Sequence, residues 1–294
     1  MHPPTLNHIL CLVDFSTLSH RGIQIGAELA RRWKASLSAF HGVNLPGDVV
    51  YGSDYSYSRP KQQRLLQEAR DRMVCFLHDF PEVAGRIAEG EPVESLCALM
   101  RQEPVDLVVV TTRHMHGIRR WISGNLIERL IRHVDCPVLI VGCKPRRNGR
   151  DFLDPKHITT VTLPDERHHR LISTAIRIAL AFEADIELLH ILETPLDIES
   201  EPYETAQSHF ERTTRKRLKE TAIRFGADSN RIRTTVLEGA PTTVLPDFLD
   251  RTPADLVVVG VRRGIPLKPT VIGSTTETVI RRCDCCVLTL PVSG

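Results

Sequence analysis

Short apolar runs alternate with longer amphipathic segments along the first half of the chain. Continuous apolar runs are typical of buried strands, whereas apolar residues that recur every three or four positions are typical of helices. We predict strands at 8–14, 36–43, 86–89, 106–111 and 137–141. We predict helices at 16–33, 59–78, 92–101 and 125–134, with Ser16 or Ser19 as the N-cap of the first.

This order of elements predicts an α/β fold. A helix between two strands carries the chain back across one face of a sheet, so the alternation predicts a five-stranded, parallel, doubly wound sheet with helices on both faces. The run from Leu107 to Val110 is apolar throughout, as expected of a strand covered on both sides. Such sheets bind ligands beyond the carboxyl ends of their strands, so we expect any site in the loops there.

The second half of the chain repeats the first at a fixed offset of 149 residues, without a net insertion from Ile9/Ile158 to Leu139/Leu288. The matched residues include His41 with His190, Arg113 with Arg262, Gly124 with Gly273, Glu128 with Glu277 and Asp106 with Asp255. The segment 144–150 between the copies is polar and contains a proline and a glycine, which indicates a linker. We therefore predict two tandem domains of one fold, residues 1–147 and 148–294.

Composition and charge exclude several classes of function. The net charge of +2 is too small to indicate a nucleic-acid-binding protein. No segment approaches the roughly 18 uninterrupted apolar residues that a membrane span needs, and the first residues do not resemble a secretory signal. Cysteines such as Cys11 and Cys97 fall within apolar runs, where a reduced thiol behaves as a small hydrophobe. We expect a cytoplasmic protein with no nucleic-acid or membrane partner.

Signatures of catalysis are missing from the sequence. There is no G-x-x-x-x-G-K-[ST], no G-x-G-x-x-G after a strand, no G-x-S-x-G and no H-E-x-x-H. His114 and His116 fit no closed zinc pattern, and Cys285 and Cys286 fall where the last strand begins. We interpret His168 and His169 as solvated loop residues. The sequence therefore predicts no catalytic or metal-binding residue and favours a binding module over an enzyme.

The candidate site follows the fourth strand of the second half. The chain there reads Val-Gly-Val-Arg-Arg-Gly from residue 259 and Ile-Gly-Ser-Thr-Thr-Glu from residue 272. Glycines let backbone N–H groups approach phosphate oxygens, and a Gly-Ser pair opens a helix whose N-terminus favours anions. The first half instead reads Thr-Thr-Arg-His from residue 111 and keeps only Gly124, followed by Asn125.

These residues resemble the universal stress proteins, and in particular their tandem members. ATP-binding members carry G-x2-G-x9-G-[ST] after this strand and an aspartate at the end of the first strand. The second half keeps Gly260, Gly273 and Ser274, but Arg263 replaces the middle glycine and Leu163 replaces the aspartate. The first half keeps the aspartate, Asp14, and loses both early glycines.

The resemblance implies an adenine nucleotide alpha hydrolase-like fold and ATP as the ligand. Binding residues carried over to the second copy are Gly260, Arg262, Arg263, Gly273, Ser274, Thr275 and, near the adenine, Ile191. In the first copy they are Asp14, Gly42, Gly124 and Asn125. Arg263 either grips a phosphate or fills the pocket, and Asp14 either caps the following helix or also holds a ligand hydroxyl.

Three functions stay open at this point. One is a stress-response regulatory module that binds ATP in the second copy. Another is a degenerate module that has lost ATP and acts through protein contacts or another small ligand, and the third is a slow ATP hydrolase. The resemblance further implies that the last strands, 138–141 and 287–290, pair edge to edge in an intramolecular pseudo-dimer, and it is compatible with a homodimer of the whole chain.

Overall fold

The computed structural model describes residues 6–44, 59–112, 124–142, 154–193, 203–262, 273–282 and 285–292. The chain divides into two compact units, Met1–Val141 and Gly142–Gly294, called here the first and the second unit. The predicted domain boundary at 147/148 falls outside the described residues and stays a prediction. The expected pairing of the two last strands also stays a prediction.

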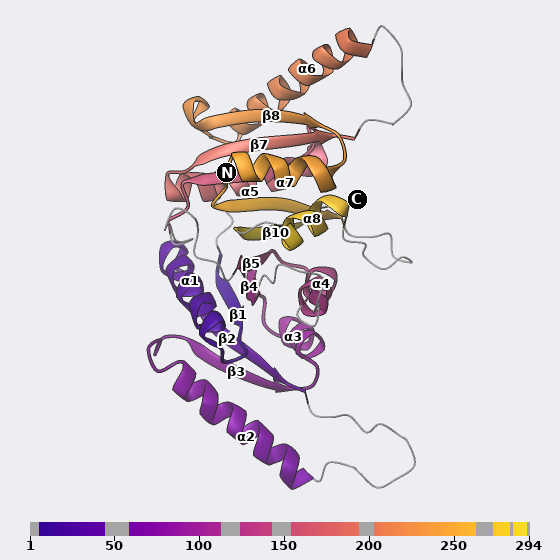
Figure 1. The fold of residues 1–294 in the computed structure, drawn as a ribbon. Helices are drawn as coiled ribbons and strands as arrows, with labels where there is room; N and C mark the ends of the chain where they lie inside the picture. Colours follow the sequence, from indigo (N-terminus) through magenta and orange to yellow (C-terminus); the bar gives the residue numbers. More distant parts are fainter. Residues whose placement is uncertain are drawn as a thin grey trace, which may run out of the picture. The chain divides into compact units, whose positions relative to one another are not determined.

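Strands and helices alternate in the first unit in the predicted order (Figure 1). The strands are β1 (His8–Leu12), β2 (Ser36–Val43), β3 (Ala84–Glu89), β4 (Leu107–Thr112) and β5 (Val138–Gly142). The helices are α1 (Thr17–Trp33), α2 (Arg59–Phe76), α3 (Pro92–Met100) and α4 (Gly124–His133). Within the unit the strand order is β3-β2-β1-β4-β5, and β1 is parallel to both β2 and β4.

The second unit repeats this order. Its strands are β6 (His157–Val161), β7 (Asp185–Leu192), β8 (Ile232–Glu238), β9 (Leu256–Arg262) and β10 (Cys286–Val292). Its α-helices are α5 (His169–Phe182), α6 (Tyr203–Arg224), α7 (Pro241–Arg251) and α8 (Ser274–Arg282), with short 3₁₀ helices η1 (Glu166–His168) and η2 (Ser229–Arg231). Within the unit the strand order is β10-β9-β6-β7-β8, and β9 is parallel to both β10 and β6.

The strand register of the first unit recurs in the second at the predicted offset. The corresponding pairs are His8 with Ser36 and His157 with Asp185, then Ile9 with Leu107 and Ile158 with Leu256. The prediction of two tandem, doubly wound α/β domains is therefore confirmed.

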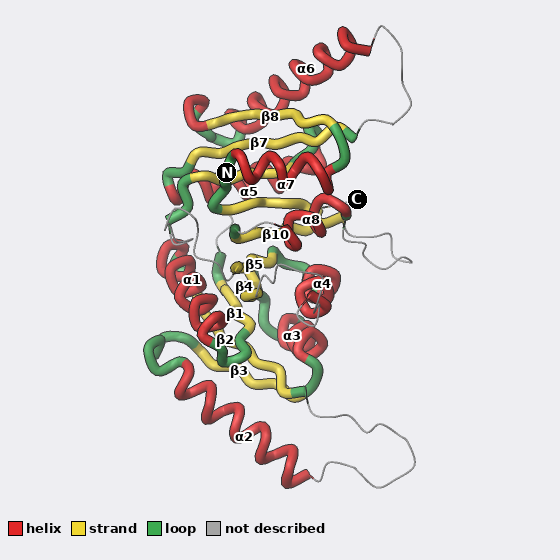
Figure 2. Tube along the Cα trace, in the orientation of Figure 1, coloured by secondary structure: helices red, strands yellow, loops and turns green. Residues whose placement is uncertain are grey.

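Helices cover both faces of each sheet (Figure 2). In the first unit α1 and α2 lie on one face, whereas α3 and α4 pack together on the other. In the second unit α5 packs on β6 and β7 and against α6, and α7 and α8 pack together. Central strand residues such as Leu10, Val108 and Val258 are completely buried. Among the helices described, none is long and apolar enough to span a membrane.

One carboxylate in each unit holds the amino ends of two neighbouring strands together. Asp106 Oδ2 accepts hydrogen bonds from the backbone N–H groups of Asn7 at 2.6 Å and His8 at 3.0 Å. Asp255 Oδ2 accepts the same two bonds, at 2.6 and 2.7 Å, from the residues that precede and open β6. These hydrogen bonds lie at the amino ends of the strands, opposite to the candidate site. Both repeated aspartates are therefore structural.

Candidate functional site

The candidate phosphate-binding residues of the second unit lie on β9 and α8. Gly260 and Arg262 are still inside β9, where they pair with Leu290 and Val292 of β10. We expected residues 260–263 to form the loop after the fourth strand. That expectation is wrong for the first three of them, because strand pairing continues through Arg262. Arg263 falls outside the described residues.

The N-terminus of α8 follows an exposed glycine. Gly273 precedes the helix, and among the residues that the structure describes, its chain neighbours aside, none has an atom within 4 Å of the place that a Cβ would take. Its carbonyl accepts the first hydrogen bond of the helix, from the N–H of Glu277 at 3.0 Å. A glycine has no side chain that could accept from the N–H groups of the first turn. Those N–H groups, on Ser274 and Thr275 among others, are therefore available to an anion.

A buried threonine that sequence reasoning missed connects the two elements. Thr276, in the first turn of α8, donates a hydrogen bond from Oγ1 to the carbonyl oxygen of Gly260 at 3.1 Å. The structure thus brings the end of β9 and the start of α8 together. A threonine two positions after a Gly-Ser pair is too common a pattern to have indicated this contact.

Packing alone can explain why residue 260 is a glycine, without a bound ligand. A Cβ at this residue would lie 3.0 Å from Val292 Cγ1 and 3.7 Å from Leu171 Cδ2. The corresponding pair in the first unit is Thr111 on β4 and Gly22 on α1, where a Cβ on Gly22 would lie 2.8 Å from Thr111 Cγ2. Large and small residues are exchanged between the copies, so Gly260 alone does not indicate phosphate.

The end of β6 is built around a histidine that the sequence interpretation placed in solvent. His168, at the end of η1, is half-buried, and its Nδ1 accepts a hydrogen bond from the Leu163 N–H at 3.2 Å. Thr162 Oγ1 lies 3.2 Å from the same nitrogen. The interpretation of His168 as a solvated loop residue is therefore wrong, because its ring holds the turn where the family has an aspartate. His169 opens α5, and its ring lies 5.6 Å from that of Phe225.

A second histidine in this region is His190 on β7. It is buried, and its Nδ1 lies 3.1 Å from the Thr162 carbonyl oxygen, which can only accept. Burial lowers the pKa of His190 below its ordinary value. Burial is also the main cause that lowers the pKa of His168, and the charges of Arg167 and Arg262 add to it against the attraction of Asp165. Ile191, the predicted adenine neighbour, follows His190 on β7 and is half-buried.

The first unit presents a carboxylate at the corresponding turn. Asp14 is exposed, and its Oδ1 accepts hydrogen bonds from the N–H (3.0 Å) and the hydroxyl of Ser16. Ser16 in turn is the N-cap of α1 and accepts from the Ser19 N–H at 3.2 Å. Partial burial acts to raise the pKa of Asp14, but the hydrogen bonds from Ser16 hold it below its ordinary value. The idea that Asp14 caps the helix is thus corrected: Ser16 caps it, and Asp14 orients Ser16.

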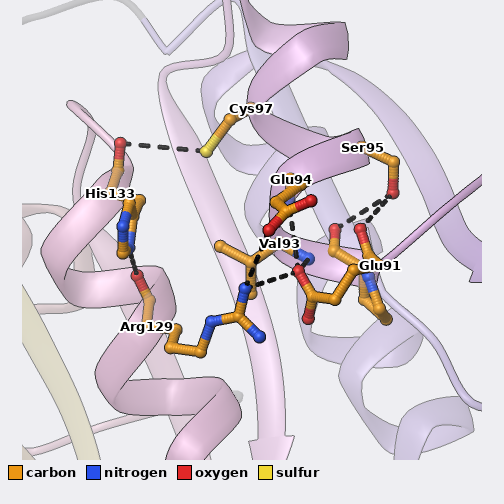
Figure 3. A network of polar contacts seen from close by, with 8 residues as sticks. Glu91, Val93, Glu94, Ser95, Cys97, Arg129 and His133 are labelled. Atoms are coloured by element: carbon orange, nitrogen blue, oxygen red, sulfur yellow. Dashed lines mark hydrogen bonds and ion pairs between the residues drawn. The ribbon is translucent and has the colours of Figure 1, made fainter. Parts of the chain in front are cut away.

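Other residues near the carboxyl ends of the strands in the first unit take part in internal packing and ion pairs. A Cβ on Gly42 of β2 would lie 2.7 Å from Pro92 Cα, so this glycine is required by the start of α3. Figure 3 shows Glu91 between the first turn of α3 and Arg129 of α4, to which it is bonded at 2.9 Å. Arg129 also approaches Glu94 at 3.5 Å, so its charge is neutralised by two carboxylates. Gly124 and Asn125 open α4.

Metal and thiol chemistry find no support in the described part of the chain. No group of three potential metal ligands occurs there, and His114, His116 and Cys283 lie outside it. Burial raises the pKa of the Cys136 thiol to about 12, which makes it a poor nucleophile. At the start of β10, Cys285 is half-buried and Cys286 is buried, which agrees with a structural role for both.

Each unit is thus a doubly wound α/β domain whose fourth helix opens on a glycine beyond the carboxyl ends of the strands, where this class of fold binds small ligands. The pattern of the universal stress protein family matches residues 5–142 and 155–291. The chain therefore belongs to the universal stress protein family and contains two of its domains in tandem.

Several proteins are similar to this chain in sequence or in fold. The universal stress protein E homolog of Haemophilus influenzae is 27% identical over 246 residues, which cover 77% of this chain and 76% of that protein. The crystal structure of a universal stress protein from Archaeoglobus fulgidus covers 98% of this chain and 97% of its own, with a TM-score of 0.69 at 14% identity. Another structure from that organism, a complex with dAMP, covers 47% of this chain and 96% of its own, with 19% identity and a TM-score of 0.33.

Proposed function

We propose that this protein is a cytoplasmic, stress-response regulatory module whose second unit binds an adenine nucleotide, ATP. The phosphates lie at the N-terminus of α8, on the N–H groups that follow Gly273, and against the end of β9. The adenine lies near Ile191. The observation that carries the proposal is the exposed helix N-terminus at Gly273, in a helix whose first turn Thr276 bonds to Gly260 at the end of β9.

The first unit is the poorer candidate for ATP. Thr111 replaces glycine at the end of β4 and packs against Gly22, so its backbone cannot be approached as closely as that of a glycine. Arg129, the cation of α4 nearest to α3, is already paired with Glu91 and Glu94. Asp14 and Gly124 are what remains of the family pattern there, and Asp14 is exposed and ionised.

A substitution at the helix N-terminus tests the proposal. Gly273→Val should abolish ATP binding in a calorimetric titration, because the valine branches occupy the place of the anion. The fold should tolerate the change, since no described residue other than the chain neighbours of Gly273 has an atom within 4 Å of the new Cβ. Gly124→Val, at the matching place in the first unit, is the control and should bind like the parent.

The other outcomes of the same titration identify the alternatives. Binding that survives Gly273→Val but is lost in Asp14→Ala would assign the site to the first unit. No heat and no displaceable ligand in the parent would support a degenerate module, a function that Leu163 and the packing of Gly260 favour. Phosphate release that disappears in Gly273→Val would indicate a slow hydrolase.

A further inference from the structure

The hydrogen bond of Thr276 is placed where it controls the geometry of the candidate site. Thr276 is 3% exposed, and its hydroxyl spans 16 residues of sequence to reach the Gly260 carbonyl oxygen at 3.1 Å. It joins the first turn of α8 to the carboxyl end of β9. These two segments supply the backbone that our proposed function assigns to the phosphates.

A second threonine on the same helix provides a contrast. Thr278 is 5% exposed, but its Oγ1 donates to the Ser274 carbonyl oxygen at 2.7 Å and so stays within α8. The first unit has Ile127 and Arg129 at the two matching positions. The connection between strand and helix is therefore specific to the second unit and to one hydroxyl group.

We propose that Thr276 is a positioning residue for phosphate binding in the second unit, an inference that rests on the proposed function. The N–H groups of a first helical turn point along the helix axis, so a small tilt of α8 redirects all of them at once. The bond to Gly260 fixes that tilt before a ligand arrives. A ligand then meets an ordered set of donors and loses less free energy in ordering them.

The test compares Thr276→Val with Thr278→Val in the full-length chain. Both changes replace a buried threonine of α8 by an isosteric side chain, but only the first breaks the connection to β9. Calorimetry should show ATP bound about three- to tenfold more weakly by Thr276→Val, the effect of one neutral hydrogen bond. Adenosine, which has no phosphate, should bind as to the parent. Thr276→Ser keeps the hydroxyl and should restore the affinity for ATP.

The comparison of ligands separates positioning from simple destabilisation. Equal losses of ATP affinity in the two valine variants, or equal losses for ATP and adenosine in Thr276→Val, would overturn the inference.

A measurement without ligand separates this inference from the proposed function. Hydrogen exchange of the Glu277 amide, which donates the first hydrogen bond of α8 to the Gly273 carbonyl oxygen, should be several-fold faster in ligand-free Thr276→Val than in ligand-free Thr278→Val. If the parent binds no ATP, the proposed function fails, and this exchange still decides whether Thr276 orders the helix N-terminus. Identical exchange in the two variants would show that it does not.

Discussion

At the scale of single residues, two histidines of the second unit, His168 and His190, have their tautomers set by the backbone. The Leu163 N–H points at Nδ1 of His168, so this nitrogen must be unprotonated and the ring hydrogen must be on Nε2. The Thr162 carbonyl requires the opposite at His190, whose Nδ1 donates. A proton added to His168 at Nδ1 would face a backbone N–H, so the geometry favours the neutral ring.

The stability of the second unit should therefore depend on pH. The pKa of each histidine is lower in the folded protein than its ordinary value of about 6.5, so the folded state binds fewer protons than the unfolded chain. The free energy of unfolding should be highest above that pH and should decrease as the pH falls below it. Urea unfolding of the full chain between pH 8 and pH 5 measures this.

His168→Asn is the matched variant for this experiment. Its side-chain oxygen can still accept from the Leu163 N–H, but it does not titrate in this range. The decrease in stability below pH 6.5 should be smaller than in the parent, because only His190 of the pair then contributes. An identical decrease would show that His168 is not one of the groups responsible.

At the scale of elements, the two units fill the contact between their first helix and fourth strand with different pairs of residues. The first unit combines Gly22 on α1 with Thr111 on β4, and the second combines Leu171 on α5 with Gly260 on β9. The space between helix and sheet is limited, so a large residue on one element requires a small one on the other. Gly260, inside the fourth strand, is therefore explained by packing alone, whereas Gly273 has no such neighbour among the described residues beyond those adjacent in the chain.

A double-mutant cycle in the first unit tests this exchange. Gly22→Ala places a Cβ 2.8 Å from Thr111 Cγ2 and should destabilise the protein by about 1–3 kcal/mol. Thr111→Ser removes that methyl group, so in its presence Gly22→Ala should be neutral or stabilising by up to about 1 kcal/mol, as alanine is the better helix residue. Chemical denaturation measures the four free energies of unfolding. Additive effects would show that the two residues do not compete for the same space.

At the scale of the whole molecule, the tandem repeat predicts that each unit keeps its own supporting contacts. Asp106 and Asp255 each accept two backbone N–H groups at the amino end of a central strand. Replacing either by alanine leaves two N–H groups without their acceptor, at a cost of about 1–3 kcal/mol each where they are shielded from water. Asp106→Ala should therefore accelerate amide exchange in β1, and Asp255→Ala should accelerate it in β6.

The two variants serve as controls for each other, since the same substitution is made in each copy. Faster exchange in β6 of Asp106→Ala, with β1 unchanged, would contradict the assignment of each aspartate to its own unit. Unchanged exchange in both variants would show that water replaces the carboxylate without loss.

Local chemistry made the elements predictable from the sequence alone. The strand at 36–43 and the N-cap at Ser16 were both predicted and found, because apolar runs and capping side chains act within a few residues. The offset of 149 residues predicted the second sheet from the first, and the register of β6 confirms it. Family membership also followed from sequence, since Gly260, Gly273 and Ser274 keep a spacing that can be recognised without coordinates.

Only the tertiary structure decided what these residues touch. The hydroxyl of Thr276 reaches Gly260, the ring of His168 holds the turn at Leu163, and Thr111 fills the space left by Gly22. None of these contacts has a sequence pattern of its own, because each depends on how a helix is set against a strand. The sequence therefore determined the fold and the family, and packing between distant segments determined which internal contacts the candidate site residues make.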